Sequence, residues 1–259
     1  MLAAQRRELI LSHLERDGVV TVAGLARQLG VSEMTVRRDL EMLDSQGQAN
    51  KVHGGATVAH GGRSNEPGFT AKSELAAPAK LAIARAAAAL VEPGAAVGLT
   101  GGTTTFLIAR ELRAMRGITI VTNSVRVAET FGDIPVAEVP VIVIGGSKTP
   151  SDALVGPMAV EAMRGLNLDF CFMGVHGMDE HSGFTSPNIL EAETNRAFAA
   201  TARRFIVVAD SSKWGEVGLA RITPLDEATA VITDDGLPPS ARQILTSHVD
   251  DVTYVKSEE

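Results

Sequence analysis

Apolar residues in the first 58 positions recur at helical spacing in three short stretches that are separated by turn residues. The third stretch follows closely, because only Gly30 and Val31 stand between the second stretch and the N-cap residue Ser32. The predicted helices cover Gln5–Arg16, Val22–Leu29 and Ser32–Ser45. The β-prone segment Ala49–Val58 has two glycines in its middle and predicts a hairpin. This order of elements is typical of a winged helix-turn-helix domain.

From residue 78 onward, short apolar runs alternate with amphipathic stretches. The apolar runs lie at Ala95–Leu99, Ile118–Thr122, Val139–Ile144, Leu168–Val175, Phe205–Ala209 and Ala230–Thr233. The helical patterns lie at Ala79–Val91, Thr104–Met115, Ser124–Phe131, Pro157–Gly165 and Ile189–Arg203. Buried runs that alternate with helices predict an α/β domain with a mostly parallel sheet.

The segment His60–Pro78 between these two patterns is rich in glycine and proline and has few large apolar residues, which is typical of a linker. We therefore expect a winged helix-turn-helix domain over residues 1–58 and a linker over residues 59–76. A larger α/β domain is expected over residues 77–259.

Composition narrows the class of protein. Apolar residues make up 45% of the chain and charged residues 21%, which excludes wholesale disorder. No apolar run reaches the roughly 18–20 residues that cross a bilayer, and charged residues occupy positions 6–8, where a signal peptide is apolar. The single Cys171 lies in an apolar run, which favours a buried small hydrophobe over a nucleophile. We expect a cytoplasmic chain with no membrane partner.

The formal net charge of −7 is unevenly distributed along the chain. Residues 1–58 hold seven basic and seven acidic residues, so the excess of acids lies in the larger domain. If the N-terminal domain of residues 1–58, the head, binds DNA, its cationic groups must therefore be concentrated on one face.

The third predicted helix has such a face. Val36, Leu40 and Leu43 recur at i, i+4 and i+7 and form its core side. In a recognition helix the first two turns meet base edges and phosphates, and arginine suits both. The candidate DNA-contacting residues on this helix and on the hairpin are Ser32, Glu33, Thr35, Arg37, Arg38, Lys51 and His53. The alternative is a small helical bundle with a solvated charged face.

Ligands of parallel α/β sheets bind beyond the carboxyl ends of the strands, so the residues after each apolar run are of interest. The first run is followed by a glycine- and threonine-rich turn that opens a helix, which suits a phosphate. The candidate phosphate-binding residues there are Gly101, Gly102, Thr103, Thr104 and Thr105. The alternative is an ordinary glycine turn with a threonine N-cap.

Three further residues are candidates for contact with the same ligand. Asn123 follows the second run and is placed to bind ligand hydroxyls, although a capping role together with Ser124 is equally open. Gly145 follows the third run and marks a close backbone approach or a simple turn. Lys213 follows the fifth run and either meets an anion or is a solvated surface lysine.

Residues 174–188 form a long, glycine-rich and polar segment. Its histidines and carboxylates raise the question of a metal site, but their spacing matches no strong zinc or calcium pattern. No metal or other cofactor is therefore expected.

The head resembles that of DeoR-family bacterial transcription regulators. The resemblance rests on Val31–Leu40, which reads VSEMTVRRDL, and on Lys51–Ala56, which reads KVHGGA. Lys51 stands where the family usually has arginine, and lysine keeps a phosphate contact but not a bidentate contact with a base.

The body resembles the DeoR-family effector domain over residues 75–257. Its landmarks here include Lys80, Gly101–Thr104, Thr122–Ser124, Gly145-Gly146, Asp169, Gly183-Phe184 and Ser212-Lys213. That domain is similar to ribose-5-phosphate isomerases, so the resemblance implies a phosphorylated sugar or related metabolite with its phosphate at Gly101–Thr105. Thr100 stands where the family often has aspartate, which leaves open which sugar is recognised.

The resemblance implies a transcription regulator, most simply a repressor, that binds double-stranded operator DNA as a homodimer or homotetramer under control of the effector. The main alternative is a sugar-phosphate isomerase with an accessory head. An isomerase needs a base and an acid beside its substrate, but the segment Met173–Gly177 lacks the carboxylates expected there. A structural nucleic-acid-binding protein is a third alternative, which the near-neutral head disfavours.

Overall fold

The computed structural model describes residues 2–45, 48–52, 54–58, 69, 73 and 75–257. The chain divides into two compact units, Met1–Ala77 and Pro78–Glu259. Most of the segment expected to be a linker lies outside the described residues, so the boundary between head and linker stays a prediction.

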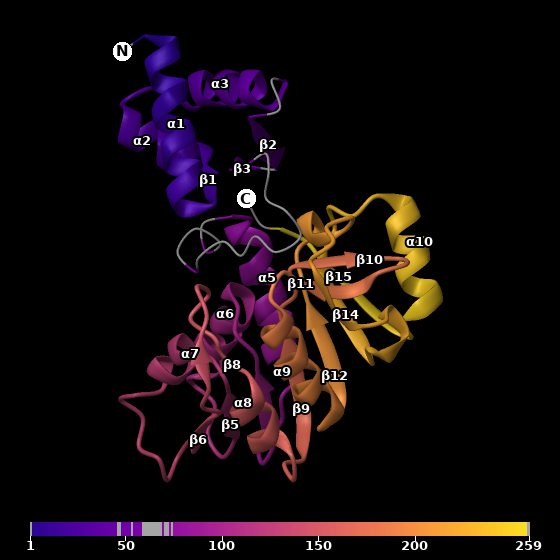
Figure 1. Ribbon diagram of the computed structural model, residues 1–259. Coiled ribbons are helices and arrows are strands. Elements are labelled where there is room, and N and C mark those ends of the chain that lie inside the picture. Colours follow the sequence, from indigo (N-terminus) through magenta and orange to yellow (C-terminus); the bar gives the residue numbers. More distant parts are fainter. Residues whose placement is uncertain are drawn as a thin grey trace. The chain divides into compact units, whose positions relative to one another are not determined.

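The first unit is a small helical head with a three-stranded sheet (Figure 1). Its elements are α1 (Ala3–Asp17), β1 (Val19–Thr21), α2 (Val22–Leu29), α3 (Glu33–Ser45), β2 (Ala49–Val52) and β3 (Gly55–Val58). The strands are antiparallel in the order β1-β3-β2, so the predicted hairpin is confirmed. The buried core gathers apolar residues from all three helices, among them Leu14, Leu25 and Leu40.

Local chemistry explains the tight connections of the head. The hydroxyl of Thr21 accepts a hydrogen bond from Gly24 N at 3.0 Å and so caps α2. Gly55 lies so close to the neighbouring strand that a Cβ there would fall 2.0 Å from Val20 O. Only glycine allows β3 to pair with β1 at that point.

The second unit is built on a seven-stranded, wholly parallel sheet in the order β15-β14-β12-β9-β4-β5-β6. The strands are β4 (Ala96–Leu99), β5 (Thr119–Thr122), β6 (Val141–Val143), β9 (Leu168–Met173), β12 (Ala202–Val208), β14 (Ala230–Asp234) and β15 (Asp251–Val255). All six predicted runs correspond to strands of this sheet, which confirms the α/β prediction.

Helices cover both faces of this sheet. They are α5 (Ala77–Ala88), α6 (Thr103–Leu112), α7 (Val125–Thr130), α8 (Pro157–Met163), α9 (Ile189–Ala200) and α10 (Pro239–His248). Phe170 and Phe172 of β9 pack in one core with α5, α6 and α7, whereas Cys171 and Met173 pack in the other core with α8, α9 and α10. Successive side chains of β9 thus point to opposite faces, which is why the strand reads as a continuous apolar run.

The larger unit also contains short strands that the pattern did not predict. The two-stranded pair β7 (Ser147–Lys148) and β8 (Leu154–Val155) precedes α8, and a second sheet contains β10 (Gly177–Asp179), β11 (Gly183–Ser186) and β13 (Ala220–Thr223). The polar segment 174–188 therefore contains the two strands β10 and β11. These short strands are only two to four residues long, which is too short for an alternation of apolar and polar residues to predict them.

Helix boundaries show one further difference. The predicted helix Ile189–Arg203 ends at Ala200, because β12 begins at Ala202 and pairs there with Leu168 of β9. Over the part of the chain that the structure describes, every helix is too short or too polar to span a bilayer.

Candidate functional site

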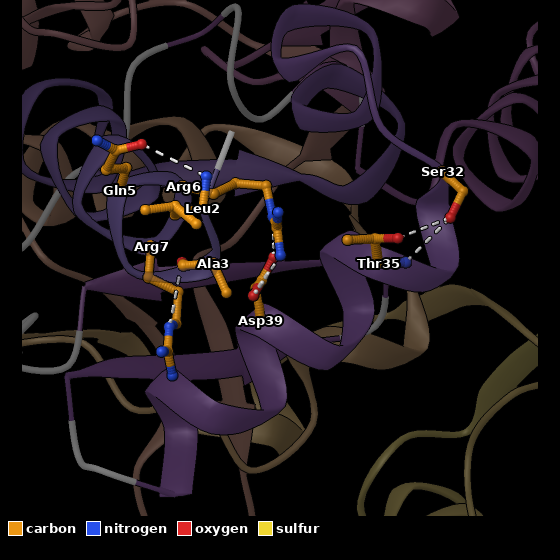
Figure 2. A network of polar contacts seen from close by, with 8 residues as sticks. All are labelled: Leu2, Ala3, Gln5, Arg6, Arg7, Ser32, Thr35 and Asp39. Carbon is orange, nitrogen blue, oxygen red and sulfur yellow. Dashed lines mark hydrogen bonds and ion pairs between the residues drawn. The ribbon is translucent and has the colours of Figure 1, made fainter.

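Helix α3 presents two different faces. Val36, Leu40 and Leu43 are at most 1% exposed and pack in the core of the head. Glu33, Met34, Arg37 and Arg38 lie on the other side and are exposed. At the start of the helix, Ser32 Oγ accepts a hydrogen bond from Thr35 N at 3.3 Å, so Ser32 has the capping role that its position predicts (Figure 2).

The basic residues of this face have acidic neighbours. Arg37 Nη2 lies 3.5 Å from Glu33 Oε2, and the Arg37 side chain is 56% exposed. Lys51 Nζ of β2 donates to Glu41 Oε1 of α3 at 2.7 Å, and this hydrogen bond lowers the pKa of Glu41. The pair ties the hairpin to α3, so Lys51 belongs to the same face as the arginines. His53, the remaining predicted residue, lies outside the described residues.

One polar contact of the head escaped the sequence analysis. Arg6 Nε of α1 donates to Asp39 Oδ2 at 2.5 Å, and Arg6 Nη2 donates to Asp39 Oδ1 at 3.1 Å (Figure 2). The two side chains are only 11% and 8% exposed. A signal was present in the sequence, because Asp39 follows Val36 by three residues and so falls on the core side of α3.

In the larger unit, the strand order reverses between β4 and β9. The chain runs outward from β4 through β5 to β6, then returns to β9 on the other side of β4 and continues through β12, β14 and β15. In sheets of this type, ligands usually bind in a crevice beyond the carboxyl ends of the strands at such a reversal. The loop after β4 carries Gly101 and Gly102, and the loop after β9 begins with Gly174.

The two loops approach each other closely at this point. A Cβ on Gly174 would lie 4.0 Å from both Gly101 O and Gly102 Cα. A Cβ on Gly101 would lie 2.6 Å from the Cβ of Ala153, which precedes β8. The β4 loop is therefore packed between the β9 loop and the β7–β8 segment, and glycine is required at its first position.

Asn123 holds the β4 loop in place. Its Oδ1 accepts a hydrogen bond from Gly101 N at 3.0 Å, and its Nδ2 donates to Leu154 O at 3.0 Å. The residue is fully buried. Capping of α7 is performed by its neighbour Ser124, which accepts from Val127 N. Asn123 thus uses both ends of its amide within the protein, a positioning role that neither sequence interpretation included.

Helix α6 begins directly after this loop, and its N-cap residue Gly102 offers no side chain to the free N–H groups of the first turn. Thr103 and Thr104 are the first two helical residues, and they are 8% and 6% exposed. The hydroxyl of Thr105, in contrast, donates to Thr100 O at 2.7 Å and to Gly102 O at 3.0 Å. Among the predicted threonines, Thr105 therefore stabilises the loop itself.

The remaining predicted residues lie around the same sheet edge. A Cβ on Gly146 would fall 2.5 Å from Val155 O, whereas a Cβ on Gly145 would meet open space, so the close backbone approach belongs to Gly146. Lys213 ends the 3₁₀ turn η1 (Ser211–Lys213) after β12 and is half-buried. Because β9 lies between β12 and β4, these two strands lie about 10 Å apart.

The carboxylate of Asp179 is held by hydrogen bonds within the protein. It accepts hydrogen bonds from Ser182 N at 2.8 Å and His181 N at 3.0 Å in the turn that joins β10 to β11. These bonds lower the pKa of Asp179. The described residues contain no group of three or more histidine, cysteine, aspartate and glutamate residues that could hold a metal. Cys171 is fully buried as expected, and burial raises the pKa of its thiol.

Comparison with known protein families matches both units of the chain. The model of the DeoR-like helix-turn-helix domain matches residues 6–61, and the model of the DeoR C terminal sensor domain matches residues 76–235. The chain belongs to the DeoR family. The resemblance seen in the sequence motifs is thereby confirmed for the head and for most of the larger unit.

Relatives in this family match over nearly their whole length. An uncharacterized HTH-type transcriptional regulator of Escherichia coli strain K12, YgbI, is 35% identical over 260 residues and covers 100% of both chains. The putative aga operon transcriptional repressor of Escherichia coli O157:H7 is 35% identical and covers 91% of this chain and 87% of its own. The regulator GlpR of Haloferax volcanii is 33% identical, with 95% and 96% coverage.

Solved structures resemble the DeoR-family chain only distantly. Ribose 5-phosphate isomerase A of Methanocaldococcus jannaschii is 20% identical, has a TM-score of 0.38 and covers 52% of this chain and 53% of its own. The delta subunit of eIF2B from Chaetomium thermophilum is 17% identical, with a TM-score of 0.41 and coverage of 60% and 56%. This likeness is too distant to bear on function.

Proposed function

We propose that this DeoR-family regulator reads operator DNA with α3 and the β2–β3 hairpin and is controlled by a phosphorylated metabolite that binds at the β4–β9 crevice. The observation that carries the DNA part is the division of α3 into a sealed core face and an exposed face with Arg37 and Arg38. An exposed basic face in the first turns of such a helix fits a major groove.

The hairpin adds a second contact to this reading. Lys51 lies next to Glu41 on α3, so its ammonium belongs to the same surface as Arg38. A lysine suits phosphate as a point charge, whereas the arginines suit the bidentate grip on guanine. We assign Lys51 to the DNA backbone and Arg37 and Arg38 to base edges and phosphates.

The proposed assembly is a homodimer or homotetramer. One head presents one recognition helix, and paired heads read two half-sites about one helical turn apart. Relatives in the family include transcriptional repressors, and we propose the same sign of regulation here. The bound protein would block transcription at its operator until the effector changes how the heads are paired.

The effector site is proposed at the start of α6. Free N–H groups and the positive end of the helix dipole favour a phosphate there. Because Gly101 N and the Thr105 hydroxyl are already bonded within the loop, we assign phosphate binding to Gly102, Thr103 and Thr104. We keep Lys213 as a candidate for the far end of the ligand and propose no contact from Gly145.

We propose binding without turnover at this site. An isomerase requires a base with a pKa near the working pH. The Asp179 carboxylate, the first aspartate after β9, is held in a turn by backbone N–H groups that lower its pKa. A carboxylate so stabilised is a weak base, which favours a sensor over an enzyme.

The test is an anisotropy titration of the full chain on duplexes that it selects from a random-sequence pool, repeated with a panel of sugar phosphates. We expect a sequence to be enriched, and one class of phosphate to release it while remaining chemically unchanged. Enrichment of no sequence would contradict the DNA assignment. Release by a phosphate that is consumed would favour the isomerase instead.

A further inference from the structure

The contact between Arg6 and Asp39 joins α1 to the helix that we propose to read DNA (Figure 2). Both nitrogen–oxygen pairs are formed, so the guanidinium meets the carboxylate with two parallel hydrogen bonds. Such a bidentate pair fixes the relative orientation of its two groups as well as their distance. The contact therefore constrains how α3 is rotated about its own axis.

The position of the Arg6–Asp39 pair beside the core of the head shows what the pair contributes. Arg6 stands one turn before the buried Ile10 on α1, and Asp39 stands one turn after the buried Val36 on α3. The pair thus continues the apolar seam between the two helices. Apolar packing alone tolerates changes of shape at similar volume, whereas the planar fork does not tolerate a change of angle.

Asp39 also lies directly beside the exposed face of α3 that we propose to contact DNA. It follows Arg37 and Arg38 in sequence, and its own side chain is nearly buried while theirs are exposed. A rotation of α3 that broke the Arg6 contact would swing both arginines away from their targets. Site residues must be held within about 0.5 Å of productive geometry, which a seam of leucine and isoleucine does not guarantee.

A purely stabilising role is the competing interpretation. Buried ion pairs are weak evidence for stability, because desolvation offsets much of their attraction and apolar replacements are often neutral or better. A pair kept at this position is therefore better explained by the geometry that it imposes. From these observations we propose that Arg6 and Asp39 are positioning residues for DNA recognition, which set the orientation of α3 and thereby sequence specificity.

This inference rests on the proposed function, since it assumes that α3 reads bases. The test uses the full-length chain and two duplexes, one selected by the unmodified protein from a random-sequence pool and one scrambled duplex of equal composition. The variants are Arg6→Lys, which keeps the charge but removes the fork, and the apolar double variant Arg6→Met/Asp39→Leu. The matched control is Arg7→Lys, because the hydrogen bond of Arg7 among the described residues goes to Ala3 O within its own helix.

We expect Arg6→Lys to weaken binding to the selected duplex about tenfold, since misplaced arginines lose base contacts. Affinity for the scrambled duplex should change by less than about twofold, because phosphate contacts are unspecific. The double variant should unfold at the same temperature as the unmodified chain or higher, yet show the same loss of specificity. Arg7→Lys should leave both affinities unchanged.

Two results would overturn the proposal. If the folded variants keep the ratio of affinities of the unmodified chain, the pair has no part in positioning. If both affinities fall equally and the head unfolds at lower temperature, the pair is a stabilising contact only. Failure of the unmodified chain to enrich any duplex is a different result, because it removes the proposed function itself.

Discussion

The exposed face of α3 and the loop after β4 differ in their exposure to solvent and in how their polar groups are bonded. The face of α3 carries long charged side chains that lie more than half in solvent, as Arg37 does, and that contact acidic neighbours loosely. The β4 loop is nearly closed to solvent, and its polar groups are bonded to one another through Asn123 and Thr105. A substitution on α3 should therefore change binding alone, whereas one in the loop should change binding and folding together.

The largest effect is expected from Arg37→Ala. Loss of a bidentate contact in each of two heads should weaken binding to the selected duplex about 100-fold or more. The free energy of unfolding should change by less than about 0.5 kcal/mol, because the Arg37–Glu33 pair is exposed. Anisotropy titration and urea denaturation measure the two quantities. Arg164→Ala at the C-cap of α8, which removes an exposed pair with Glu161, is the control. Full affinity of Arg37→Ala would refute the role of α3.

Asn123→Ala should show the opposite behaviour. It leaves Gly101 N and Leu154 O unpartnered in a buried place, so the larger unit should lose about 2 kcal/mol or more of unfolding free energy. The response to the effector should fall as well, since the β4 loop is no longer held. Asn167→Ala, at an exposed asparagine of the same unit, should change neither. An unchanged urea midpoint for Asn123→Ala would show that the loop does not depend on this amide.

Thr103→Ala tests the ligand side of the loop. Because Thr103 opens α6, we expect a weaker response to the effector, by about fivefold for one lost hydrogen bond. Binding to the selected duplex without effector should stay the same. The measurement is the concentration of sugar phosphate that releases half of the bound DNA, with Thr246→Ala on α10 as the control. An equal response from both variants would move the phosphate away from α6.

Glu41→Gln should produce the smallest change, and it should be a gain. The carboxylate of Glu41 holds Lys51 at 2.7 Å, so DNA phosphates must compete with it for the ammonium. Removal of the charge should raise the affinity for DNA about twofold to threefold, within the range expected for an exposed pair. The gain should shrink at higher salt. Weaker binding would mean that Glu41 itself contacts DNA.

The sequence predicted helices and strands better than it predicted tertiary contacts. Apolar periodicity found the α2 boundaries and six of the seven strands of the parallel sheet, because a short apolar run marks each of these strands. It did not find β15, α10 or the short strands β10 and β11. Of these, β11 pairs with the distant β13, where Phe184 lies opposite Thr223.

For the candidate sites too, local sequence patterns predicted position better than tertiary contacts. Glycine and threonine after β4 predicted a ligand site at the end of that strand, since local chemistry at a strand end is visible in one stretch of sequence. The Arg6–Asp39 pair joins residues that are 33 positions apart, and the two ends of the Asn123 amide reach partners 22 and 31 positions away. Contacts of that kind depend on tertiary structure, which no local pattern encodes.

The central position of β4 has a consequence for the order in which the chain folds. Its pairing with β9 joins Val97 to Phe170, so the β4 loop gains its partner Gly174 only after more than 70 further residues have been synthesised. The head, in contrast, closes its core within its first 56 residues. Local contacts form before distant ones, and domains fold as units from the N-terminus during synthesis. The nascent chain is therefore expected to complete the fold of its head before the loops after β4 and β9 can meet, so the unit proposed to contact DNA forms before the unit proposed to bind the effector.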